Sequence, residues 1–407
     1  MGLNTFVAGD EILASEVNEN FSKINNIFFS DGTDGDVTIS TAVTLTKDMN
    51  YKALTIASGG TLNTNGYRLN ALEIDIQSGG SIDMGGGSGS NGEAGSSGGG
   101  GGSGGTLVHG NGSLIASAPG ENGGAGGNSG DPYGTAGTVG DSRTFSLGVE
   151  GANGGRGGPS RWESVPAGGA SGGVRGTISL PDISIINIHT AKKFNFSDLS
   201  DEGIIKQFQN TAGSGSGGGG ARGRGSDTEY GGGGGGSGSS GGFCYLLASS
   251  IIVNGDINLN GGAGGDGGLG ESSGGFQSGA GGGGGAGGGS GGVLTLIALD
   301  ISGSGNINLS GGAGGDGGNG GNANYDSLVD YVFSGDGGAG GNGGNGGHFF
   351  KVYENDTSTI TVSLTAGTAG VKGEAGTAYD LASPGSDGSN GSAGTIGTTT
   401  NIQISLT

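Results

Sequence analysis

The stretch Gly311–Asn322 reads GGAGGDGGNGGN, four triplets in which two positions are glycine and the third is Ala313, Asp316, Asn319 or Asn322. A period of three is the repeat of the polyproline II helix, which has no internal hydrogen bonds and turns its backbone N–H and C=O groups outward. Glycine on two of three faces lets neighbouring backbones approach closely, and the third face carries a side chain to solvent. The pattern predicts a packed bundle of such helices, called polyglycine II.

The same triplet phase recurs in blocks at 337–348, 261–269 and 123–128. Collagen is excluded because it needs abundant proline, whereas this chain of 407 residues has 111 glycines and only 6 prolines. A flexible linker is the alternative, since ordering one glycine costs on the order of 1–2 kcal/mol. A hydrogen bond returns only about 1 kcal/mol net, so glycine helices have to pack together against an apolar layer.

An internal duplication predicts that apolar layer. The segment IIVNGDINLNGGAGGDGGLG from Ile251 recurs as ISGSGNINLSGGAGGDGGNG from Ile301, and a looser copy ends at VSLTAGTAGVKGEAG from Val362. An apolar run precedes each copy, at residues 243–250, 293–300 and 349–354. The predicted unit is strand, turn, strand and glycine helix, so short strands flank the glycine layer.

The region before the glycine blocks has a strand pattern of its own. Apolar residues alternate from Leu54 to Gly87 between Ser-Gly-Gly and Asn-Gly turns, and β-branched residues alternate from Val37 to Thr46. We therefore expect a small β-roll or β-solenoid over residues 31–84. Residues 85–407 are expected to form the polyglycine II domain with inserted loops.

A Gly-poor insertion at 177–210 interrupts this domain. Its sequence predicts strands and then a capped helix, which either plugs an end of the bundle or forms an exposed lobe. The expected fold class is thus mainly β and irregular, with a short N-terminal helix, a small β-roll and a polyglycine II bundle.

Residues 1–30 are expected to form an attachment segment with an amphipathic helix over 16–27. Ser15 is suited to cap this helix, and four apolar residues follow at spacings of four, three and four on one helical face. Such a stripe fits docking on the chain's own β-roll or association with other copies. The four residues are Val17, Phe21, Ile24 and Phe28.

Composition excludes several classes of function. Fifteen basic and 36 acidic residues give a net charge of −21, which opposes nucleic acid and anionic membranes. No apolar run approaches the roughly 18 residues that span a bilayer, and no secretion signal is recognisable, so we expect a soluble chain. The single cysteine, Cys244, lies in an apolar run and is expected to be a buried, inert thiol.

Metal and nucleotide sites are not expected. The blocks GGAGGDGGL and GGAGGDGGN come near a calcium-binding nonapeptide, but glycine stands where that motif needs a bulky apolar residue, so Asp266 and Asp316 are expected to face solvent. No glycine run is followed by Lys and Ser or Thr, as a phosphate loop requires. The histidines lie far from other ligands: His109, His189 and His348. We therefore expect no cofactor, no metal and no catalytic residues.

Two patterns resemble bacteriophage tail proteins. The segment NTFVAGDEILASEVNENFSKI, at 4–24, resembles the amino-terminal segment of phage tail and fibre proteins. The GGX blocks, over about residues 85–407, are similar to the glycine-rich adhesin at the tip of the long tail fibres of T-even-type phages. In that family polyglycine II helices form a sandwich, and the loops between them contact the host receptor. This chain departs from the family in carrying a β-roll and a longer Gly-poor insertion.

By that resemblance, receptor contacts belong to the loops between glycine blocks, where aromatic residues gather. Such residues suit protein or sugar recognition, and the alternative is that they cap the ends of the bundle. The only tryptophan stands in a loop bounded by Pro159 and Pro166 and is the first candidate. The candidates are Tyr133, Arg161, Trp162, Phe276, Tyr325, Tyr331, Phe333 and Tyr379, with Phe145 and Tyr230 in the same loops.

The resemblance implies a non-enzymatic adhesin of the virion, extracellular after release, that binds a host-surface protein or polysaccharide. Other tail or fibre proteins are expected partners, and a homotrimer fits a fibre. Alternatives are a purely structural fibre subunit, a polysaccharide depolymerase and an ice-binding protein. A depolymerase needs two close carboxylates, and no spacing here exceeds chance. An ice-binding face would be more uniform than these third positions.

Overall fold

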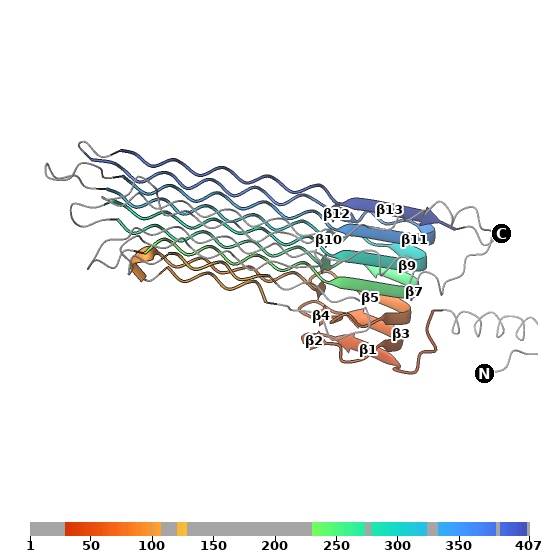
Figure 1. Cartoon of the computed structure of the whole chain (residues 1–407). Coiled ribbons are helices and arrows are strands. Elements are labelled where there is room, and N and C mark those ends of the chain that lie inside the picture. The colour runs from red at the N-terminus through yellow and green to blue at the C-terminus, as the bar shows by residue number, and fades with distance from the viewer. Residues whose placement is uncertain are drawn as a thin grey trace, which may run out of the picture.

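Parallel β-sheets and long glycine segments make up the computed structural model of this chain (Figure 1). The strands gather at one end, and the glycine segments run away from them side by side. The described residues are 29–97, 99–106, 120–127, 230–272, 278–323, 333–379 and 383–404.

The strands form two parallel sheets, so the protein is mainly β. Among the described residues the only helix is a 3-10 turn, η1 (Gly95–Ser97). The first sheet has seven strands in the order β1 (Asp36–Ile39), β3 (Met49–Ile56), β5 (Leu69–Ile76), β7 (Phe243–Val253), β9 (Val293–Ser302), β11 (His348–Asp356) and β13 (Thr398–Gln403). The second has six, in the order β12 (Thr361–Ser363), β10 (Asn306–Asn308), β8 (Asp256–Asn258), β6 (Ser81–Asp83), β4 (Thr61–Asn63) and β2 (Ala42–Thr44).

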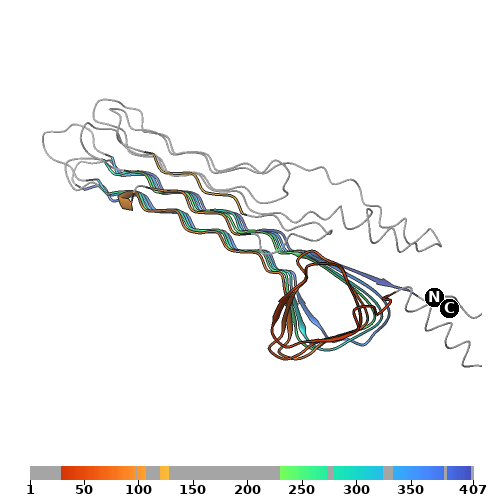
Figure 2. The ribbon, with the colours of Figure 1, turned by 90° about the horizontal axis from the view of Figure 1, so that it is seen from below.

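Successive turns of chain, here called coils, stack on one another around a three-sided interior (Figure 2). Alternation along each strand turns every second side chain inward, and parallel register then places like residues above one another. One such ladder joins five residues in register: Leu62, Ile82, Ile257, Ile307 and Val362. Its first four members are at most 1% exposed, so the stack encloses a continuous aliphatic core.

The sheets continue across residue 84, where the sequence analysis placed the end of the β-roll. Strand β5 pairs directly with β7, with Leu69 opposite Leu246 and Ile76 opposite Val253. The apolar runs expected to flank the glycine layer thus lie in β7, β9 and β11, further strands of the first sheet. The sequence alone suggests two separate domains, because residues 85–242 lie between these strands and the β-roll.

From β6 onward, each coil leaves the sheets through an outgoing segment and comes back through a return segment. The outgoing segments are 85–94, 259–272, 309–322 and 364–377, and the return segments are 231–242, 278–292, 334–347 and 383–397. Figure 2 shows that the segments of successive coils superimpose in layers. Two shorter segments, 99–106 and 120–127, bond to the first return segment.

Hydrogen bonds between these segments repeat every three residues. The first glycine of each triplet donates to the third residue of the next outgoing segment, as Gly264 N–H does to Ala313 O at 2.8 Å. The second glycine donates across to a return segment, as Gly265 N–H does to Gly236 O at 2.8 Å. Every segment is therefore bonded in two directions by backbone alone.

Backbone contact at these positions leaves no room for a Cβ atom. A Cβ on Gly265 would lie 2.0 Å from Ser90 O, and one on Gly264 would lie 2.2 Å from Ala286 O. Because the obstructing atoms belong to bonded backbone, they have no free direction in which to move. Glycine is thus strongly favoured at the first two positions of an inner triplet, and the exceptions within return segment 278–292 are the small residues Ala280 and Ala286 at second positions.

The third residue of the triplet is exposed or half-buried in the outgoing segments 259–272 and 309–322, where it also completes the bonding, whereas third positions of the return segments 231–242 and 278–292 are buried. Asp266 Oδ1 accepts the N–H of Asp316 at 2.8 Å, and Asp316 Oδ1 accepts the N–H of Val371 at 2.7 Å. Asn342 and Asn345 serve the last return segment in the same way. Asparagine and aspartate recur here because their side chains accept the N–H of the third residue in the next coil, which no backbone carbonyl accepts.

The expected helix at 16–27 lies outside the described residues, and so do Val17, Phe21, Ile24 and Phe28. The Gly-poor insertion at 177–210 also lies outside them.

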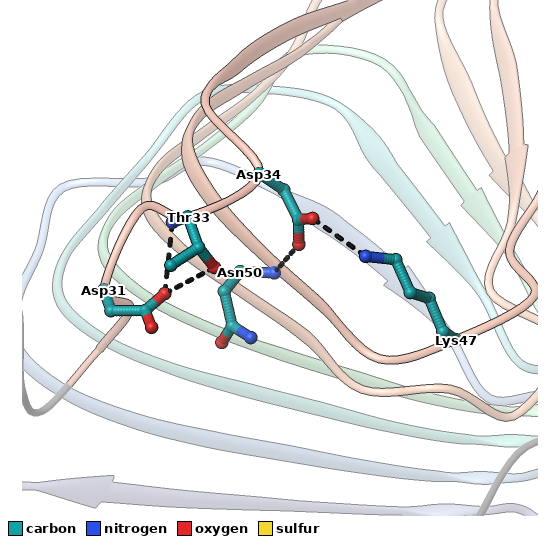
Figure 3. A network of polar contacts seen from close by, with 5 residues as sticks. All are labelled: Asp31, Thr33, Asp34, Lys47 and Asn50. Carbon is teal, nitrogen blue, oxygen red and sulfur yellow. Dashed lines mark hydrogen bonds and ion pairs between the residues drawn. The ribbon is translucent and has the colours of Figure 1, made fainter.

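A carboxylate fastens the first coil (Figure 3). Asp34 Oδ1 lies 3.0 Å from Lys47 Nζ, and its Oδ2 accepts the Asn50 N–H at 2.7 Å. Beside it, Asp31 Oδ1 accepts both the N–H and the hydroxyl of Thr33. The Asn50 N–H, and then Lys47, hold the pKa of Asp34 below its ordinary value.

We expect Asp34→Asn to lower the free energy of unfolding by about 1 kcal/mol at neutral pH, because the charge that Lys47 and Asn50 favour is lost. A lowered folded pKa gives stability that is present above the unfolded pKa of about 3.9 and is lost as pH falls through the folded value. The difference between variant and parent in urea titrations should therefore vanish in acid.

The control is Asp36→Asn, whose partner Lys52 lies 3.7 Å away with both side chains 65% exposed. Exposed pairs contribute little, so this variant should match the parent throughout. A deficit of Asp34→Asn that persists unchanged in acid would contradict the assignment.

We expect Gly265→Ala to destabilise the fold by about 3 kcal/mol or more, since its methyl group has to displace bonded backbone. Leu269→Ala changes an exposed third position of the same segment, with Leu269 54% exposed, and should leave the thermal midpoint nearly unchanged. Equal midpoints for the two variants would show that the close packing is absent.

Candidate binding site at the distal end

All outgoing segments end, and all return segments begin, at the end of the molecule opposite the sheets, here called the distal end (Figure 1). Three chain stretches connect them there in sequence: 273–277, 324–332 and 380–382. A fourth stretch, 128–229, also starts and finishes at this end, because the Gly231 N–H donates to Gly127 O at 3.1 Å. The distal end thus gathers the connections of four coils.

The two flanks of the first connection are bonded to the flanks of the second. Ser272 Oγ accepts the Asn322 N–H at 3.0 Å on one flank. On the other flank Ser278 Oγ accepts the Phe333 N–H at 3.1 Å, and the Gly279 N–H donates to Phe333 O. These contacts fix the spacing between the two connections.

The second and third connections are joined in the same manner. Ala323 bridges Ala378 in parallel, and Phe333 bridges Ser383. The Tyr379 N–H donates to Ala323 O at 3.3 Å, and Ser334 Oγ accepts the Gly385 N–H at 2.7 Å. The flanks of all three connections therefore form one bonded row.

A reciprocal contact fastens the fourth stretch to this row. The Tyr230 N–H donates to Glu271 Oε2 at 3.0 Å, and the Glu271 N–H donates to Tyr230 O at 3.3 Å. Glu271 directly precedes Ser272, so the end of residues 128–229 is held beside the first connection.

Two sequence-predicted candidates lie on the flanks. Tyr379 is 49% exposed, and Phe333 is half-buried with its backbone in the bridge to Ser383. The other six lie outside the described residues, in stretches that begin and end at the distal end: Tyr133, Arg161, Trp162, Phe276, Tyr325 and Tyr331. Phe276, Tyr325 and Tyr331 thus belong to short connections between described flanks, whereas Tyr133, Arg161 and Trp162 belong to residues 128–229, of which the structure describes only the two flanks.

Sequence reasoning missed the residues that fix the flanks. Glu271, Ser272 and Ser278 are small or polar residues in a serine- and glycine-rich context, and nothing in their neighbours distinguishes them from solvent-facing positions. The one available signal is their position, where the GGX phase stops and where it restarts.

Chemically reactive groups are sparse in the part of the chain that the structure describes. No three side chains of His, Cys, Asp and Glu gather there as a metal ion would require. No helix there has the length and apolar content to cross a bilayer.

Cys244 is fully buried in β7, as expected, and burial raises its pKa to about 12. A thiol in that environment is protonated and unreactive.

Comparison of the chain with protein-family models, with curated proteins and with solved structures gives no match.

We expect Ser278→Ala to speed hydrogen exchange at the Phe333 amide, because Ser278 is 1% exposed and no water replaces the lost acceptor. The measurement is amide exchange by mass spectrometry on a peptide that begins at least two residues before Phe333 and ends near residue 347. Ser389→Ala, on the exposed face of the last return segment, is the control and should leave these peptides unchanged. Identical exchange in both variants would show that Ser278 does not hold this flank.

Proposed function

We propose that this chain is the receptor-binding adhesin of a phage tail fibre, which displays loops from a polyglycine II scaffold to the host cell surface. One observation carries the proposal. Phe333 and Tyr379 lie on bonded flanks at the distal end, and Phe276, Tyr325 and Tyr331 stand in the short connections between such flanks. In this proposal the protein binds and does not catalyse.

The polyglycine II assignment rests on the bonding pattern. Neighbouring outgoing segments bond with a repeat of three residues, as in Gly311 to Thr365, Gly314 to Thr368 and Gly317 to Val371. Outgoing and return segments run in opposite senses, so the proposed sandwich mixes parallel and antiparallel neighbours. Outward-facing N–H and C=O groups at a period of three are the property of this helix type.

The scaffold suits recognition because it fixes the loop flanks before any ligand arrives. Binding costs less when the contact groups are already ordered, since less conformational freedom is lost. Bonded flanks such as Ser272 to Asn322 and Phe333 to Ser383 supply that order. The connections themselves remain free to vary, because no triplet rule applies to them.

The opposite end of the molecule supplies the attachment in this proposal. The first coil begins at β1, on the side of the sheets, and residues 1–30 precede it. We assign attachment to other virion proteins to this segment, with Val17, Phe21, Ile24 and Phe28 as its apolar contacts. A host-surface protein or polysaccharide and the fibre would then bind at opposite ends.

A purely structural subunit is the competing function. Loops that pack against identical copies in a filament should resemble one another from coil to coil. The connections SGGFQ at 273–277, NYDSLVDYV at 324–332 and DLA at 380–382 differ in length and in sequence. Such divergence on uniform flanks favours contact with a foreign surface.

The test is saturable binding of the purified protein to whole bacterial cells. We expect a variant with Trp162, Tyr325 and Tyr331 changed to alanine to lose at least about tenfold in affinity, as aromatic contact residues do. The control variant replaces Val43, Val371 and Ile396 with alanine, which are exposed hydrophobic residues away from the connections. It should bind like the parent.

Both variants are compared with the parent by thermal unfolding, so that loss of fold is recognised. Equal affinity of the aromatic variant and the parent would reject these loops as the contact surface. Filaments formed by a parent that binds no strain in a broad panel would instead support the structural subunit.

A further inference from the structure

The last coil carries side chains where the inner coils carry glycine. The first triplet positions of its outgoing segment are Ala366, Ala369, Lys372 and Ala375, and those of its return segment are Asp387, Asn390, Ala393 and Ile396. In the preceding coil every equivalent position is glycine: 311, 314, 317 and 320, and 337, 340, 343 and 346. The exception coincides with the end of the stack.

These positions matter because their N–H groups bind the following coil. Gly317 N–H donates to Val371 O at 2.8 Å, and Gly340 N–H donates to Ser389 O at 2.8 Å. In the part of the chain that the structure describes, no further coil follows the last one to accept such bonds. An uncapped edge of this kind would accept any glycine segment with the same spacing.

Side chains of the last coil accept these N–H groups instead. Asn390 Oδ1 accepts the Lys372 N–H at 3.0 Å, and Asp387 Oδ1 accepts the Ala375 N–H at 2.9 Å. The other oxygen of Asp387 pairs with Lys372 Nζ. The outgoing segment is thus closed by the return segment of its own coil.

Charges also end the aliphatic core. The register that aligns Leu69, Leu246 and Leu296 next reaches Lys351, and the register of Ile251 and Ile301 next reaches Asp356.

Lys351 Nζ and Asp356 Oδ2 pair with each other, with side chains 14% and 15% exposed. In β13, Asn401 continues the ladder of Lys351, so a further coil placed there would stack on a polar side chain and bury this ion pair at a cost that packing does not return.

We propose that the last coil is a built terminus, a surface that closes the stack against a second copy of this chain. Three features support it: side chains at the first triplet positions, side-chain acceptors for the Lys372 and Ala375 N–H groups, and a charged pair in the strands of the core. The inference is independent of the loops and of the proposed function.

The test is an open-edge variant, in which Lys372, Ala375, Asp387 and Asn390 are changed to glycine. Its freed N–H groups and bare faces should pair with another molecule, so the average mass in sedimentation should rise about twofold or more with concentration, relative to the parent. The control places four glycines at third positions of the same segments, at Thr368, Glu374, Ser389 and Thr395. Its mass should follow that of the parent.

Two results would overturn the proposal: an open-edge variant whose mass matches the parent, or a control that associates equally. A measurement on the parent covers the case in which the variant does not fold. Hydrogen exchange at the Lys372 and Ala375 amides should be slow, and Asp387→Ala with Asn390→Ala should accelerate it without changing exchange at Gly317. Fast exchange of both amides in the parent would show that the caps do not exist.

Discussion

The structure depends on hydrogen bonds between backbone segments that lie too close together to admit a Cβ atom. Each inner glycine segment donates hydrogen bonds to neighbours in two directions. A Cβ atom added to one of its glycines would clash with a carbonyl oxygen, as one on Gly265 would at 2.0 Å from Ser90 O. Bonding that satisfies so many polar groups needs several segments in fixed register. The aliphatic ladder of the sheets provides that register, because parallel strands place equivalent residues of successive coils above one another. The two parts depend on each other: the glycine segments have no apolar side chains to bury, and the sheets alone are short.

How far the sequence predicts this arrangement depends on the range of each signal. The triplet phase, the duplicated unit and the alternation from Leu54 are local patterns, and they predicted the strands and the triplets that the structure describes. Continuity of the sheets was missed because β5 and β7 are separated by residues 85–242, and pairing across such a distance leaves no local trace. The role of Asp266 was half predicted: its exposure follows from the triplet, whereas its bond to the Asp316 N–H requires knowing which coils are adjacent. Glu271 and Ser278 were missed since their partners belong to other coils.

Separation of scaffold and connection has a physical cause here. Within a segment a side chain at the first two positions meets backbone, so the pattern there admits only glycine and a few small residues such as Ala286. Between segments, from Ser272 to Ser278 or from Ala323 to Phe333, the triplet pattern stops, and the two flanks of each connection are bonded to those of the next. Sequence can therefore change in the connections while the distance between their flanks stays constant. A surface that has to recognise changing partners needs variable contact residues on a constant scaffold. The triplet rule is therefore consistent with the proposed adhesin function.

The same rule distinguishes the two ends of the stack from its interior. A second-position glycine faces the preceding coil, and a first-position N–H bonds to the following one. The first outgoing segment has no preceding outgoing neighbour, and there the second positions carry Ser90 and Glu93, whose N–H groups bond to residues 99–106. The last coil has no following neighbour, and there the first positions carry side chains such as Lys372 and Asp387. At the two ends, the position that departs from glycine thus follows from which neighbour is missing, whereas within the stack Ala280 and Ala286 are small exceptions. A sequence of this kind therefore encodes, beside the number of its coils, where the stack begins and where it ends.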